Sequence, residues 1–81
     1  AIQCYLQAID IDPSLVVLYT NAANAFARVG EHERAIEMTS HAIELDPNFE
    51  KCYYRRGCSL MALGEYTRAL HDLRRVARLC P

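Results

Sequence analysis

The sequence predicts an all-α solenoid of five helices arranged as antiparallel pairs. Shifting the 81-residue chain against itself by 34 positions gives 13 identities over 47 aligned positions, where roughly three are expected by chance. Within each period, apolar residues recur at the helical spacing i, i+3, i+4 and i+7. Glycine and proline stand at the same places in successive periods, where they separate one helix from the next.

The first complete period predicts two helices, over residues 15–29 and 33–45. Gly30 ends the first of them, because glycine tolerates the left-handed conformation that follows many helices. Asp46-Pro47 ends the second, because proline disfavours a helical residue before it and has no amide to donate. The next period predicts helices over 49–63 and 66–79, and Asn48 is the expected N-cap of the former.

The chain therefore divides into three parts. Residues 1–14 hold the second helix of a truncated unit, over 1–11, and residues 15–48 and 49–81 are two complete units. Small residues at matching positions suit a close approach of helices. These residues are Ala8, Ala23, Ala35, Ala42, Gly57 and Ala69.

Composition excludes several classes of protein. A hydrophobic fraction of 52% with 23% charged residues excludes disordered and low-complexity chains. No apolar run approaches the ~18 residues of a membrane helix, no signal-peptide pattern is present, and a net charge of −1 argues against general nucleic-acid binding. We expect neither membrane nor nucleic acid as a partner. Four cysteines without a CxxC pair are expected as free thiols in a cytoplasmic, or also nuclear, protein.

The sequence offers no enzyme site. His32, His41 and His71 are scattered over or near the second helices of the units, where solvated helix faces explain them. HExxH, GxGxxG and P-loop patterns are absent. No catalytic residue, metal or cofactor is therefore expected.

The face of interest belongs to the first helix of each pair, which lines the concave side in such a stack. Residues at i, i+4, i+7 and i+11 point the same way. These two stripes are Val17, Asn21, Asn24 and Arg28, and Lys51, Arg55, Cys58 and Ala62. Adjacent stripes place Asn21 beside Arg55 and near Lys51, and such a group suits an acidic peptide end. Arginine binds a carboxylate through two bonds, lysine adds a point charge, and asparagine both donates and accepts.

The repeated pattern resembles the tetratricopeptide repeat over the whole chain. Its residues are Tyr19, Ala23, Phe26, Gly30, Ala35, Ala42 and Pro47, and then Tyr53, Gly57, Leu60, Gly64, Ala69 and Pro81. Two positions depart from the family. Arg56 stands where leucine is usual and Val76 where alanine is usual, and both are expected to loosen packing locally.

The stripes further resemble the carboxylate clamp with which some of these repeat proteins bind the acidic C-terminus of heat-shock chaperones. Asn21, Lys51 and Arg55 match the clamp in identity and spacing, and Asn24 and Arg28 extend the site. The clamp's remaining lysine and asparagine belong to a helix before residue 1. The resemblance implies a chaperone C-terminal peptide as partner. Its parent would be a co-chaperone or, from the string Tyr53-Tyr54-Arg55-Arg56, a Ser/Thr phosphatase of the protein phosphatase five family.

Two alternatives remain. The groove can instead serve a scaffold that binds an internal segment or helix without a carboxylate requirement. A basic aromatic patch for nucleic acid is disfavoured because Tyr53 falls at a core position of the repeat. We also expect self-association through the terminal helices, whose apolar residues lack neighbours on one side.

Overall fold

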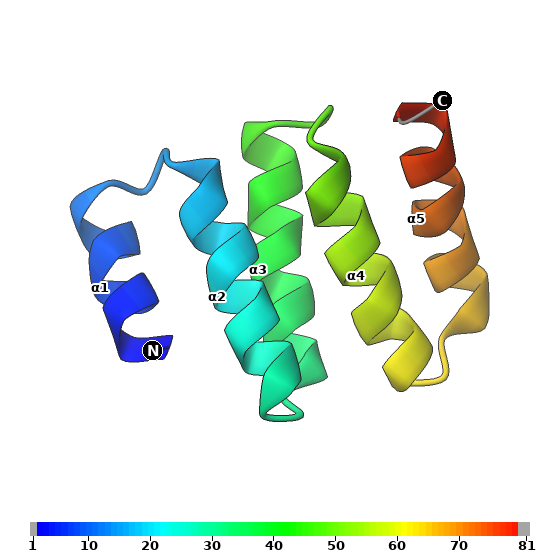
Figure 1. The fold of residues 1–81 in the computed structure, drawn as a ribbon, viewed down its shortest axis with the longest axis horizontal. Coiled ribbons are helices and arrows are strands. Elements are labelled where there is room, and N and C mark those ends of the chain that lie inside the picture. The colour runs from blue at the N-terminus through cyan, green and yellow to red at the C-terminus, as the bar shows by residue number, and fades with distance from the viewer. Residues whose placement is uncertain (1, 80–81) are drawn as a thin grey trace.

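The computed structural model describes residues 2–79, which form five α-helices in a single row (Figure 1). They are α1 (Ile2–Ile11), α2 (Val16–Arg28), α3 (His32–Leu45), α4 (Glu50–Ala62) and α5 (Tyr66–Leu79). The predicted all-α solenoid is confirmed, and each predicted helix end lies within a residue of the observed one. Ala1, Cys80 and Pro81 lie outside the described residues.

The helices form two layers. Each helix packs on its neighbours along the chain, and α2 also contacts α4, with α3 lying behind α2 in Figure 1. Among residues 2–79, α1, α3 and α5 make no such contact with one another. The helices α2 and α4 therefore form an inner row that is packed more closely than the outer row.

Two glycines end the inner helices in the same way. Gly30 and Gly64 have φ angles of 83° and 80°, a conformation that side chains with a Cβ rarely adopt. The residue after each glycine donates its amide to a carbonyl in the last helical turn, Glu31 to Phe26 and Glu65 to Leu60, both at 2.9 Å. This Schellman arrangement satisfies carbonyls that the helix end leaves open and turns the chain back into the outer row.

The turns between units are held by aspartate and tyrosine. Asp12 Oδ1 accepts the amide of Ser14 at 3.2 Å, and Asp46 Oδ1 accepts the amide of Asn48 at 3.3 Å. The predicted N-cap role of Asn48 is wrong. Phe49 occupies that position without a side-chain cap bond, because the aspartate turn already uses the Asn48 amide.

A tyrosine hydroxyl ties each inner helix to the turn before it. Tyr19 Oη donates to the Pro13 carbonyl at 2.9 Å, and Tyr53 Oη donates to the Pro47 carbonyl at 2.7 Å. Both rings are buried. The bond satisfies the polar end of a buried tyrosine and fixes the angle at which each unit begins.

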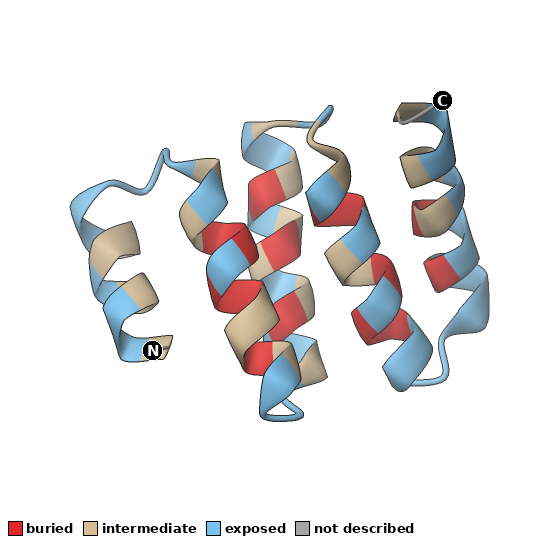
Figure 2. Ribbon diagram, in the orientation of Figure 1, coloured by how far each residue is buried: buried red, intermediate tan, exposed pale blue. Residues whose placement is uncertain are grey.

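Buried residues gather where α2, α3 and α4 face one another (Figure 2). Of the predicted small contact residues, Ala23, Ala35, Ala42, Gly57 and Ala69 are buried. Ala8 is half-buried, because α1 packs only against α2 and has no buried residue. The core is thus centred on the complete units.

Arg56 does not leave the loose spot that its departure from the family pattern predicts. Its Nε and Nη2 atoms donate to the two carboxylate oxygens of Asp72 at 2.8 and 2.9 Å, and its Nη1 donates to Ser40 Oγ at 3.3 Å. Asp72 is only 2% exposed. A single guidanidinium thus joins α3, α4 and α5, and the hydrogen bond from Asp72 raises the pKa of Arg56, which keeps it charged.

Candidate functional site

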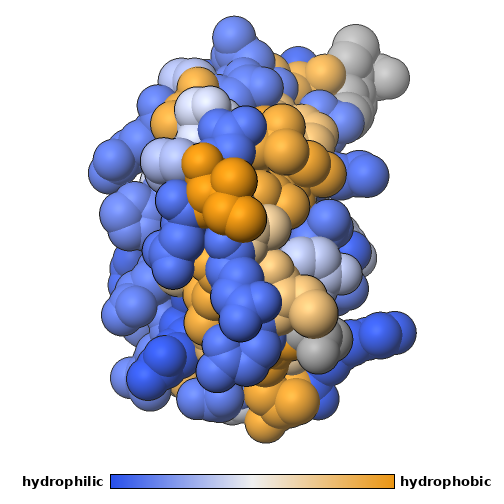
Figure 3. All heavy atoms as spheres, turned by 90° about the vertical axis from the view of Figure 1, so that its left-hand side faces the viewer, coloured by the Kyte–Doolittle hydropathy of each residue, from blue (hydrophilic) through white to orange (hydrophobic). Residues whose placement is uncertain are grey.

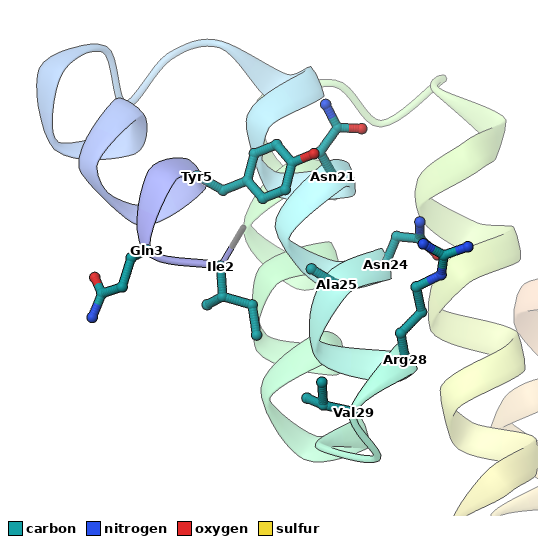
Figure 4. Close-up of a pocket in the computed structure, with 8 residues that line it drawn as sticks. All are labelled: Ile2, Gln3, Tyr5, Asn21, Asn24, Ala25, Arg28 and Val29. Carbon is teal, nitrogen blue, oxygen red and sulfur yellow. The ribbon is translucent and has the colours of Figure 1, made fainter.

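The two predicted stripes lie at the surface of the inner row. On α2, Asn21 and Arg28 are exposed and Asn24 is half-buried. On α4, Lys51 is exposed and Arg55 is half-buried. Figure 4 shows the side chains of Asn24 and Arg28 extending together from the same side of α2.

The stripes are related by one repeat. Arg55 follows Asn21 by 34 residues, so the two occupy equivalent positions on α2 and α4, which contact each other. Helices in contact have axes about 8–10 Å apart, so the two stripes run side by side. The structure therefore brings Asn21, Lys51 and Arg55 to one face.

This face carries cations without carboxylates. Lys51, Arg55 and Arg28 are the charged members of the two stripes, and none of them forms an ion pair within residues 2–79. Like charges repel one another, so the face favours an anionic ligand. It does so in a chain whose net charge is −1.

Arg55 has an aromatic neighbour that sequence reasoning did not assign to the site. Its guanidinium carbon lies 6.0 Å from the centroid of the Tyr54 ring, within range of a weak cation–π contact. Adjacent positions on a helix point in different directions, which is why the spacing of the stripes did not reveal this pair. The contact restricts the directions in which the guanidinium can extend.

A hollow of about 540 Å³ adjoins Asn21, between α1 and α2 (Figure 4). The ring of Tyr5 points toward Asn21, and Ile2 lies across from Ala25 on α2. Viewed from the α1 end, the molecule presents a strip of apolar side chains between hydrophilic margins (Figure 3). The hollow lies where the repeat would place a helix equivalent to α2 one unit earlier.

The remaining reactive groups form no second site. Among residues 2–79, no three His, Cys, Asp or Glu residues lie close enough to hold a metal ion. His41 and His71 are exposed as predicted, but His32 is half-buried, and its Nδ1 atom is buried without a hydrogen-bond partner. Within the same span, no helix is both long and apolar enough to cross a membrane.

The three cysteines that the structure describes are free thiols, as expected, and Cys80 falls outside the described residues. Cys4 and Cys58 are exposed, and Cys58 lies on the α4 stripe. Cys52 is buried, and this burial, followed by the charge of Asp46, raises the pKa of its thiol from 9.0 to about 11. Cys52 is therefore an inert core residue.

Comparison with known proteins agrees with the repeat. Models of the tetratricopeptide repeat match residues 4–37 and residues 50–81. The second such domain of Spaghetti (RPAP3), solved with the HSP90 peptide SRMEEVD, is 32% identical to this chain with a TM-score of 0.94. The match covers 96% of this chain and 72% of that one. The chain belongs to the tetratricopeptide repeat family.

Two more solved domains are similar over nearly the whole chain. The first domain of Spaghetti, also bound to SRMEEVD, is 36% identical with a TM-score of 0.97, over 99% of this chain and 64% of that one. The TPR2B domain of yeast Sti1, solved in a complex with pHsp70, is 33% identical with a TM-score of 0.94, over 98% and 63%. This chain thus spans about two thirds of the length of those domains, and it has the fold of a protein-interaction module.

Proposed function

We propose that the face formed by α2 and α4 binds the acidic C-terminal peptide of a heat-shock chaperone. One observation carries the proposal. Lys51 and Arg55 occupy one stripe without a carboxylate and lie beside Asn21 of the preceding unit. The two Spaghetti domains support it, because both were solved with an HSP90 peptide that ends in Glu-Glu-Val-Asp.

Each residue has a distinct role in this proposal. Arg55 donates two parallel bonds to a peptide carboxylate, and Lys51 supplies a point charge. Asn21 donates its amide to the same carboxylate region while its oxygen accepts a peptide amide. Arg28 and Asn24, further along α2, meet the acidic side chains that precede the peptide end.

The hollow beside Asn21 favours a second candidate, a scaffold that binds an internal helix of a partner. Ile2, Tyr5, Ala25 and Val29 give it a largely apolar lining. A helix inserted there needs no free carboxylate, since its binding energy comes from apolar burial. Sensitivity to the peptide's C-terminal charge separates the two candidates.

The parent protein belongs to the same proposal. A co-chaperone, or a Ser/Thr phosphatase brought to its chaperone by this module, fits a clamp, and either would act in the cytoplasm or also in the nucleus. A metallophosphatase domain in the parent sequence would decide for the second.

The test is calorimetric titration of the parent protein with the peptide SRMEEVD, free and amidated at its C-terminus. Arg55→Ala should weaken binding tenfold or more, because hydrogen bonds to charged groups contribute about 1.5–3 kcal/mol. Arg68→Ala is the matched control, since Arg68 is an exposed arginine on α5, outside both stripes.

Amidation of the peptide and added salt should both weaken binding, since the interaction is between opposite charges. An Arg55→Ala protein with unchanged affinity would contradict the clamp. Equal binding of the free and amidated peptides at all salt concentrations would favour the scaffold instead.

A further inference from the structure

The C-terminal end of the described solenoid presents a second surface, on the side of α5 and α4 that faces away from α3. Among residues 2–79, α5 contacts only α4 (Figure 1). Four large apolar residues are about half-exposed there. They are Tyr54 (49%), Met61 (47%), Tyr66 (64%) and Leu70 (50%). We call this surface the α4–α5 end face.

The same surface one unit earlier is covered by a helix. The 34-residue counterparts of the four residues are Thr20, Ala27, His32 and Ile36, on α2 and α3. There α4 packs against both helices, and Thr20 is only 5% exposed. The repeat therefore shows that this surface accepts a helix in the position that α4 takes on α2 and α3.

The side chains of the end face are larger and more apolar than their covered counterparts. Thr20 becomes Tyr54, Ala27 becomes Met61 and His32 becomes Tyr66. A surface meant for water would change in the opposite direction, since contiguous exposed apolar groups mark interaction sites. The substitutions indicate a face that is covered when the protein works.

Charge identifies the chemistry of the covering helix. Seven of the nine Lys and Arg residues lie after residue 48, whereas seven of the ten Asp and Glu residues lie before it. Arg74 and Arg78 are exposed one turn apart on α5, and neither forms an ion pair within residues 2–79. Like charges at this spacing destabilise a helix, so a partner with carboxylates would relieve them.

The interior contact shows what Arg74 faces. Arg56 of the covering helix α4 donates to Ser40 on α3 at 3.3 Å, and the counterpart of Ser40 on α5 is Arg74. A helix with arginine at the Arg56 position would place two guanidinium groups together. The end face therefore disfavours a second copy of α4, and the same position on its partner must be acidic or neutral.

We propose that the α4–α5 end face binds an amphipathic, acidic helix of a partner protein. The apolar stripe of that helix covers Tyr54, Met61, Tyr66 and Leu70, and its carboxylates pair with Arg74 and Arg78. This surface is distinct from the stripes that hold Asn21 and Lys51, so the partner is a second one.

The probe is a synthetic helix of about 20 residues, long enough to be partly helical in water. It carries leucine at i, i+3, i+4 and i+7 with glutamate along one edge of the leucine stripe, and an amidated C-terminus so that it offers no terminal carboxylate. A matched probe has lysine in place of glutamate. Fluorescence anisotropy with the parent protein should show the glutamate probe binding at least about tenfold more tightly.

Charge reversal on the protein gives the decisive comparison. The double variant Arg74→Glu with Arg78→Glu should reverse the preference between the two probes, while SRMEEVD binding stays unchanged. Arg68→Glu is the matched control, because Arg68 already pairs with Glu65 at 3.3 Å, and it should leave the preference as it is.

Three results would overturn the proposal. They are equal affinity for the two probes, a preference that survives the double reversal, and absence of binding because another part of the parent chain covers the face. None of them depends on whether the chaperone peptide binds, so failure of the clamp and failure of this inference remain distinguishable.

Discussion

The α2–α3 pair and the α4–α5 pair have the same backbone arrangement but different cores. In the first, Ala22 is fully buried and Met38 packs against its cluster. The counterparts 34 residues later are Arg56 and Asp72, which form a buried ion pair. An apolar contact and an ionic contact thus occupy the same place in consecutive units.

A second pair of positions differs in volume. Ala23 and Thr39 of the first unit correspond to Gly57 and Leu73 of the second. A Cβ on Gly57 would lie 2.9 Å from Leu73 Cδ2, closer than real contacts of this kind. The larger leucine is accommodated because its partner has lost a methyl group. The comparison teaches that core positions on facing helices change together, so that the repeat geometry is preserved.

Breaking the ion pair should produce the largest effect. Asp72→Ala leaves the Arg56 guanidinium only 22% exposed and without its carboxylate. Removing one partner of a buried pair costs about 3–5 kcal/mol, and the remaining water access of Arg56 places this case near the lower end. Urea unfolding followed by circular dichroism measures the change.

The sister unit supplies the control. The double variant Arg56→Ala with Asp72→Met copies the Ala22–Met38 contact into the second unit. It should recover most of the lost stability, because an apolar pair of suitable volume often replaces a buried ion pair without loss. A double variant as unstable as Asp72→Ala would show that the two units are not interchangeable at these positions.

Gly57→Ala tests the volume pair and should cost about 1 kcal/mol. Overpacking against Leu73 costs about 1–3 kcal/mol, and the higher helix propensity of alanine offsets part of this. Adding Leu73→Thr copies the first unit and should remove the clash. Thermal unfolding of the three proteins measures both steps, and a stabilised Gly57→Ala protein would contradict the volume argument.

Much of this fold could be predicted from the sequence, because the signals that define it are local. Gly30 and Gly64 give the helix ends, and the 34-residue shift gives the phase of the repeat. Asn48 was misassigned because an aspartate turn and an asparagine cap compete for the same amide, and only geometry decides between them. Arg56 and Asp72 lie 16 residues apart on different helices, so their pairing depends on packing. The joint change from Ala22 and Met38 was the available signal.

The candidate site was predictable to a different extent. Helical spacing was enough to place Asn21, Lys51 and Arg55 on one face, because all three lie on regular helices in register. The hollow that joins Tyr5 to Asn21 was not predictable, since it depends on how α1 rests on α2. The peptide partner itself stays a prediction.

The tyrosine–proline bond is common to both units, so its removal should have the same effect in each. Tyr19→Phe and Tyr53→Phe should each cost about 1 kcal/mol, because each leaves one proline carbonyl without its donor. Urea midpoints of the two variants measure this. A clearly larger loss at Tyr53 would indicate that its contacts with Arg56 and Arg75, at 5.9 and 5.5 Å from the ring, depend on the hydroxyl bond.

The smallest effect at neutral pH concerns Cys52, the counterpart of Leu18. Burial raises the pKa of its thiol to about 11, whereas the unfolded chain has a value near 9.0. Between these values the unfolded chain loses the thiol proton and the folded protein keeps it, so this contribution to stability is complete below pH 9 and decreases as the pH rises toward 11. Cys52→Ala should therefore unfold with a weaker pH dependence than the wild type above pH 9. Iodoacetamide at pH 7.5 should modify the exposed Cys58 and leave Cys52 unmodified until the chain unfolds, because the reagent needs an accessible thiolate. Equal labelling of the two cysteines in the folded protein would contradict the placement of Cys52 between α4 and the core of the preceding unit.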